Sequence, residues 1–145
     1  MSGREAKTAF TLDPRLEADT RAVARLPLCR VLLVNDSRFP WLILVPERAG
    51  VREIHQLAPA ERAVLIEEVA AAARALERLT GAEKMNVAAL GNQVPQLHVH
   101  VIARFAKDQA WPTPVWTKPG AVAYDQAAMA RLAAQLAAAL AGPNS

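Results

Sequence analysis

The sequence predicts an α+β fold, with helices packed against one face of a mainly antiparallel sheet. Three features support this class: two short apolar segments joined by turn-forming residues, a long amphipathic segment, and an alternating segment at residues 96–104. Strands that follow each other through short connections tend to pair antiparallel. A chain of 145 residues can bury one proper core, so we expect a single domain over residues 1–145.

The composition argues against several classes of function. The net charge of +3 is mildly basic and the Lys and Arg residues are scattered, so we expect no nucleic-acid partner and favour a small anionic ligand such as a nucleotide. The single cysteine, Cys29, excludes an internal disulfide and a cysteine-based zinc finger. No apolar run approaches the ~18 residues of a membrane span and the N-terminus lacks a signal pattern, so we expect a cytoplasmic protein without a membrane partner.

The first third of the chain predicts a helix and a hairpin. After a polar and flexible start (1–9), an Asp-Pro pair marks a helix start, and apolar residues at helical spacing extend the predicted helix over 14–25. Residues 29–34 and 41–45 are short, apolar and rich in β-formers. The turn formers between these two runs predict an antiparallel hairpin.

The remaining predicted elements are, in order, a helix over 59–80, a strand over 85–90, the alternating strand, an irregular segment over 105–120 and a helix over 124–140. The first of these helices has an apolar stripe opposite a charged face and is followed by Gly81, a residue common just past a helix end. The irregular segment contains three prolines and two tryptophans. With the last helix it makes up a C-terminal segment over 105–145.

The alternating strand carries two of the three histidines of the chain, His98 and His100. Strand side chains point to opposite faces with period two. One face is therefore expected to carry Gln96, His98, His100, Ile102 and Arg104, and the other Leu97, Val99, Val101 and Ala103. The second face is wholly apolar and belongs in the core. A core strand that places imidazole, amide and guanidinium groups on one face indicates a ligand site.

Three interpretations of the histidine pair compete. Both side chains can be structural histidines with satisfied hydrogen bonds. A His-x-His pair can also supply two metal ligands, but a third ligand is then required and His55 is remote in sequence. In the third interpretation a neutral imidazole acts as the nucleophile in phosphoryl chemistry, and the second imidazole contacts the same phosphate.

The string Gln93 to Arg104 (QVPQLHVHVIAR) resembles the signature of the histidine-triad (HIT) nucleotide hydrolases and transferases, His-φ-His-φ-His-φ-φ, where φ is apolar. The apolar pair Val101-Ile102 fixes the register of the comparison. His98 then takes the middle, nucleophilic place and His100 the last. Gln96 stands at the first place, which departs from the family pattern.

The resemblance covers about residues 10–120 and includes the hairpin, the long helix and the loop before the histidines. It implies a five-stranded antiparallel sheet with helices on it and a homodimer in which two sheets become continuous. It also implies in-line attack by the middle histidine on the α-phosphorus of a nucleotide, giving a nucleotidyl-histidine that water then hydrolyses. No metal site on the protein is implied, although a divalent cation such as Mg²⁺ can accompany a polyphosphate substrate.

Carried over residue by residue, the resemblance makes His98 the nucleophile and His100 a donor to the phosphate or the leaving oxygen. Asn92 and Gln93 would contact phosphate oxygens, and Asn35 or Asp36 would hold the ribose. Apart from the resemblance, the place of Arg104 on the histidine face leads us to expect that it adds donors for the phosphate oxygens. For Trp111 and Trp116 we weigh two roles, packing or dimer contacts and a base-stacking platform, and we expect packing or dimer contacts.

Gln96 decides between two functional hypotheses. Glutamine donates and accepts hydrogen bonds like a neutral imidazole, but it does not titrate near neutrality. If the first position orients the nucleophile, the chain is a hydrolase of a dinucleoside polyphosphate, like diadenosine tetraphosphate hydrolases, or of a nucleoside phosphoramidate. If that position supplies protons, the chain is better described as a nucleotide-binding dimer with little or no turnover.

Overall fold

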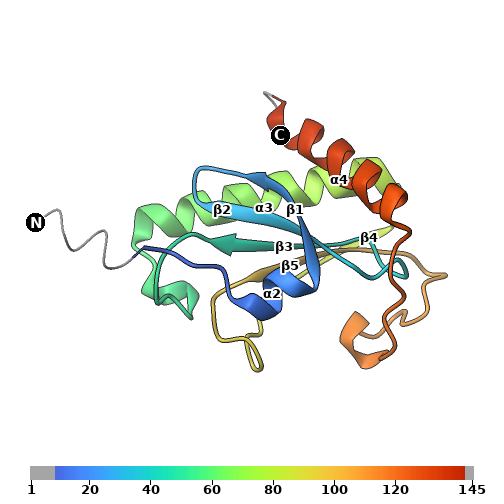
Figure 1. The fold of residues 1–145 in the computed structure, drawn as a ribbon, viewed down its shortest axis with the longest axis horizontal. Helices are drawn as coiled ribbons and strands as arrows, with labels where there is room; N and C mark the ends of the chain where they lie inside the picture. The colour runs from blue at the N-terminus through green and yellow to red at the C-terminus, as the bar shows by residue number, and fades with distance from the viewer. Residues whose placement is uncertain (1–8, 143–145) are drawn as a thin grey trace, which may run out of the picture.

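A computed structural model of the protein describes residues 9–142, and at its centre lies a five-stranded antiparallel sheet with the strand order β1-β2-β3-β5-β4 (Figure 1). The strands are β1 (Thr20–Arg25), β2 (Cys29–Val34), β3 (Trp41–Pro46), β4 (Lys84–Ala88) and β5 (Val99–Arg104). The helices are α2 (Pro14–Ala18), α3 (Pro59–Thr80) and α4 (Gln126–Ala141), with single 3-10 turns η1 (Ile54–Gln56) and η2 (Val115–Thr117). The predicted fold class and the antiparallel hairpin are confirmed.

One face of the sheet is covered by α3 and α4, and the main core lies between them (Figure 1). Alternate residues of the three central strands enter this core, including Val31, Leu44 and Val101, and they meet Leu76 of α3 and Leu136 of α4. Helix α3 begins with Pro59 at its first turn and ends at Thr80. The next residue, Gly81, has a φ of 70°, in the left-handed region that favours glycine.

The other face is partly covered by the N-terminal segment. Leu12 and Leu16 pack there against Leu32, Ile43 and Val45, which are the outward-facing residues of β2 and β3. Helix α2, with Asp13 as its capping residue, holds this segment in place.

The helix predicted over 14–25 is wrong in its second half, since helix α2 ends at Ala18 and residues 20–25 form β1. Strand β1 pairs antiparallel with β2, from Thr20 opposite Val34 to Arg25 opposite Arg30. This pairing satisfies the backbone groups of β1 that face β2. Residues 20–25 form a strand and not a helix because tertiary pairing outweighs their weak local helix propensity.

The other boundaries move by a few residues. The strand predicted at 85–90 lies at 84–88, the final helix at 126–141, and the strand part of the histidine segment at 99–104, so that residues 96–98 lead into it. The flexible start predicted for 1–9 falls almost wholly outside the described residues. Within the described range 9–142, no helix is both long and apolar enough to cross a membrane.

Candidate active site

Strand β5 and the residue just before it place the two histidines on the sheet face opposite the main core, as the alternation predicted. Leu97, Val99, Val101 and Ala103 all lie in the main core. His98, just before the strand, and His100, within it, are 6% and 8% exposed, and their ring centroids are 5.0 Å apart in a T-shaped arrangement. Both imidazoles are therefore buried, and they lie next to each other.

His98 is held by the backbone two residues before it. Its Nδ1 lies 2.7 Å from the carbonyl oxygen of Gln96. A carbonyl oxygen only accepts hydrogen bonds, so Nδ1 must carry the hydrogen and donate it. In the neutral ring this assigns the lone pair to Nε2, the nitrogen that a nucleophile or a base would use.

His100 is fixed in the opposite tautomer. The indole N–H of Trp41 donates to Nδ1 of His100 over 3.0 Å, and an indole nitrogen is a donor only. Nδ1 is therefore unprotonated and Nε2 carries the hydrogen. Burial of the ring, and then the neighbouring His98, lower the pKa of His100 from 6.5 to about 4. Near neutral pH this side chain is an uncharged N–H donor.

The side chain of Gln96 binds the N-terminal segment. Its Oε1 accepts the backbone N–H of Asp13 over 2.9 Å, and its Nε2 donates to the carbonyl of Thr11 over 2.9 Å. These two bonds use both functions of the amide group and fix the residue whose own carbonyl orients His98. The contribution of Gln96 to the nucleophile thus runs through its backbone.

Two pockets of about 410 Å³ each adjoin the histidine face. The pocket that holds both histidines, called here the histidine pocket, is lined by Trp41, Leu90, Gly91, Asn92, Gln93, Val94, His98, His100 and Trp116. The second, called here the Asn35 pocket, includes Asn35 and Asp36 together with Trp41 and Trp116. Trp41 and Trp116 line both pockets, so the two pockets are adjacent. Asn92 and Gln93, predicted to contact phosphate, thus lie near Asn35 and Asp36, predicted to hold the ribose.

Within the Asn35 pocket both predicted ribose residues already hold neighbouring backbone. Oδ1 of Asn35 accepts the N–H of Tyr124 over 2.9 Å. Asp36 is buried, its carboxylate pairs with Arg38 over 2.8 Å and it accepts the N–H of Val122. Burial raises the pKa of Asp36, but the hydrogen bonds from Arg38 outweigh it and keep the pKa below its usual range.

Arg104 lies on the histidine face but does not line either pocket. It is 1% exposed, and its guanidinium donates to Asp108, to Oδ1 of Asn86 and to the carbonyl of Thr113. The expectation that Arg104 contacts a phosphate is therefore corrected: its donors are used inside the protein. The strand alternation predicted the face on which the Arg104 side chain lies, but not the loop residues that cover it.

Two pocket residues were missed by sequence reasoning. Trp41 pairs with Ile102 in the β3–β5 ladder and so lies on the same face as His100, but the neighbour relation of β3 and β5 is a tertiary fact. Trp116, expected to be a packing or dimer contact, has its ring centroid 5.5 Å from that of His100. Its only sequence signal was an aromatic residue in a proline-rich segment.

The third histidine does not complete a metal site. His55 and His98 both line a smaller pocket of about 200 Å³, which also includes Arg52 and Glu53. Among the described residues, no group of three or more His, Cys, Asp or Glu side chains is arranged to hold a metal ion.

The comparisons with known proteins agree on one family. The HIT domain matches residues 15–107, while a comparison with curated proteins finds no match. A histidine triad protein from Bradyrhizobium japonicum is 42% identical, with a TM-score of 0.89 over 91% of this chain and 98% of its own. One from Sinorhizobium meliloti is 48% identical, with a TM-score of 0.86 over 88% of this chain and 94% of its own. One from Marinobacter aquaeolei is 46% identical, with a TM-score of 0.88 over 91% and 96%.

Proteins of this family bind nucleotides and typically hydrolyse or transfer them. The family match spans all five strands and both histidines, and the similar structures cover nearly the whole chain. On these grounds the chain belongs to the HIT domain family.

Proposed function

We propose that this protein is a nucleotide hydrolase in which His98 attacks the α-phosphorus of a dinucleoside polyphosphate or a nucleoside phosphoramidate. The observation that carries the proposal is the 2.7 Å contact between Nδ1 of His98 and the carbonyl of Gln96, because it leaves Nε2 as the free nucleophile. The new Nε2–phosphorus bond forms as the bond to the leaving group breaks. Water then attacks the nucleotidyl-histidine and releases a nucleoside monophosphate.

His100 is proposed to donate its Nε2–H to a phosphate oxygen or to the leaving oxygen. Because Trp41 holds Nδ1 and the pKa is about 4, His100 near neutral pH is a hydrogen-bond donor and not a proton source. Such a preorganised neutral donor stabilises the charge that develops on oxygen without a proton transfer. Asn92 and Gln93, in the wall of the histidine pocket, are proposed to add donors to the phosphate oxygens.

His100, as an uncharged donor, favours a polyphosphate leaving group over an amine. An amine expelled from a phosphoramidate has to gain a proton, whereas a nucleotide expelled from a polyphosphate leaves as a stable anion. His98 and His100 are the titratable residues among those that line the histidine pocket. We therefore expect a dinucleoside polyphosphate to be turned over faster than a phosphoramidate of the same nucleoside, with any Mg²⁺ arriving on the polyphosphate.

The position of Gln96 supports hydrolysis over the alternative of a binding module without turnover. Its amide supports the loop that presents its carbonyl to His98, and no proton transfer is needed from it. Glutamine at this place therefore preserves the orientation of the nucleophile. The ribose is proposed to lie in the Asn35 pocket, where the amide NH₂ of Asn35 is a donor for a sugar oxygen.

We also propose a homodimer formed along the β4 edge. β4 is an outer strand of the sheet, and Val87 on it is 51% exposed. An edge strand presents unpaired backbone groups that pair readily with a second copy and would make the two sheets continuous. Sedimentation of wild type and Val87→Lys checks this: we expect a dimer that the charged residue weakens, and a monomeric wild type would contradict it.

The function is tested by metal-free incubation of wild type, His98→Ala and a control with diadenosine tetraphosphate and with AMP phosphoramidate. The control is Arg78→Ala, which changes an exposed residue in the last turn of α3, on the opposite side of the sheet from the histidines. Chromatography follows the release of nucleoside monophosphate. We expect release by wild type and Arg78→Ala and none by His98→Ala, with the polyphosphate as the faster substrate. If wild type binds AMP but releases nothing from either compound, the hydrolase proposal is wrong and the binding module remains.

A further inference from the structure

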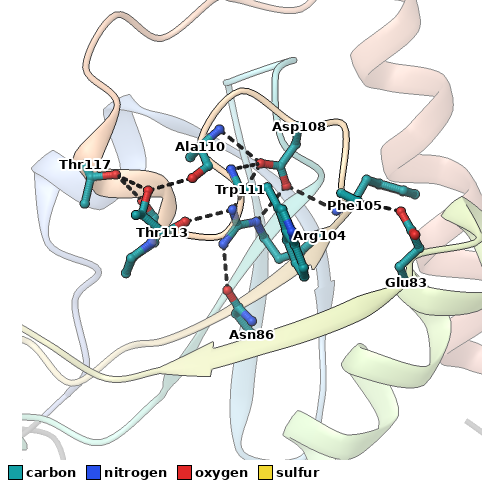
Figure 2. Close-up of polar contacts among 11 residues, drawn as sticks. Glu83, Asn86, Arg104, Phe105, Asp108, Ala110, Trp111, Thr113 and Thr117 are labelled. Carbon is teal, nitrogen blue, oxygen red and sulfur yellow. Dashed lines mark hydrogen bonds and ion pairs between the residues drawn. The ribbon is translucent and has the colours of Figure 1, made fainter.

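The segment after β5 is fixed by a buried ion pair that the proposed chemistry does not use. Nε and Nη2 of Arg104 donate to the two oxygens of Asp108 over 2.8 and 3.0 Å, and Asp108 also accepts the backbone N–H groups of Phe105, Ala110 and Trp111 (Figure 2). Burial alone would raise the pKa of Asp108, but these hydrogen bonds hold it at about 2. The pair therefore stays charged at ordinary pH and shapes one tight loop.

The same arginine reaches further along the chain to the turn that carries Trp116. Its Nη2 donates to the carbonyl of Thr113 over 2.8 Å, and the Thr113 hydroxyl lies 2.9 Å from that of Thr117 (Figure 2). Between them Val115 is buried against Phe39, Ile102 and Ala110. Turn η2 is thus held by the Thr113–Thr117 contact at its two ends and by the packing of Val115 beneath it.

Trp116 is the residue that this support leaves exposed. It is 42% exposed although both neighbours in η2 are anchored, and it lines both the histidine pocket and the Asn35 pocket. Isolated exposed apolar residues are common on proteins, but a ring on a rigid support between two hollows is typical of a ligand contact. A ligand that occupies both pockets therefore meets the two residues that line both of them, Trp41 and Trp116.

We propose that Trp116 contacts the base of the bound nucleotide, and that the Arg104–Asp108 pair is a positioning device which keeps its ring in the wall shared by the two pockets. The inference rests on the proposed function and names the part of the substrate that this wall selects. Aromatic side chains stack on bases of every kind because each base has a π-face. Trp116 therefore selects for the presence of a base more than for its identity.

The test compares two ligands that differ only in the base. AMP and ribose 5-phosphate carry the same phosphate and sugar, and NMR titration measures dissociation constants up to the millimolar range. For Trp116→Ala we expect AMP binding to weaken about tenfold while ribose 5-phosphate binding is unchanged. The control Trp111→Phe keeps a ring over Arg104, alters the same loop outside both pockets and should change neither constant.

A double-mutant cycle tests the positioning role. Asp108→Asn should weaken AMP binding in the same direction, and it should have no further effect in the Trp116→Ala background if it acts through that ring. Where Asp108→Asn fails to fold, Thr117→Val removes the hydroxyl contact to Thr113 while keeping the ion pair, and a smaller loss of AMP affinity is expected.

The outcomes separate the two proposals. AMP binding by wild type that Trp116→Ala leaves unchanged, or an equal loss for AMP and ribose 5-phosphate, would overturn the base contact and leave the hydrolase proposal standing. Additive effects of Asp108→Asn and Trp116→Ala would overturn the positioning role. If wild type binds neither ligand, the proposed function fails and this inference with it.

Discussion

Acidification should destabilise this protein through His100 before the carboxylates titrate. The pKa of His100 is lowered from 6.5 to about 4, first by burial and then by His98. Between these two values the unfolded chain binds a proton that the folded chain excludes, so stability is present above pH 6.5 and is lost as the pH falls toward 4. A change of this size corresponds to about 3 kcal/mol of unfolding free energy.

The assay is urea unfolding of wild type and His100→Gln at pH 7, 5.5 and 4. Glutamine keeps an acceptor for the Trp41 N–H and does not titrate, so the difference between the two proteins isolates His100 from the carboxylates. We expect wild type to lose about 3 kcal/mol more than His100→Gln between pH 7 and pH 4. Equal losses in the two proteins would refute the assignment of a buried, neutral His100.

Three further changes test the site and the core that supports it. Trp41→Phe removes the N–H that opposes protonation of Nδ1 in His100, so NMR should show the pKa of His100 above about 4. Steady-state assays should show kcat about threefold to tenfold lower, as expected for the loss of one hydrogen bond. Gln96→Ala releases the loop that presents the Gln96 carbonyl to His98, so kcat should fall about tenfold. Gln96→Glu keeps the acceptor for the Asp13 N–H, so its kcat should fall less. An unchanged kcat in Gln96→Ala would contradict the orienting role. Glu68 is buried in α3 and accepts two backbone N–H groups at the start of β2. Glu68→Gln leaves one of these N–H groups facing an amide donor. Denaturant titration should therefore show about 2 kcal/mol less unfolding free energy, with little change in AMP binding.

Local pattern was sufficient where one element's own residues decided the outcome. Helix α3 has a proline at its first turn, an apolar stripe and a glycine just past its end, and it lies at the predicted residues. The period-two alternation of residues 97–104 assigned the core face and the histidine face correctly. The helix predicted through 25 was wrong because β1 owes its conformation to pairing with β2, a partner that its own spacing does not reveal.

The chemical types in the site follow from the sequence alone: two imidazoles at alternate positions on one strand face, a glutamine before them and an amide-rich loop. Which atoms face one another was decided by the tertiary structure. Trp41 reaches Nδ1 of His100 because β3 pairs with β5, and the Gln96 amide binds the chain near Thr11 because that segment covers the outer sheet face. Arg104 became a structural residue because Asp108 folds back over it. A strand's period fixes the direction of a side chain, whereas its partners come from segments whose distance in sequence carries no signal of contact in space.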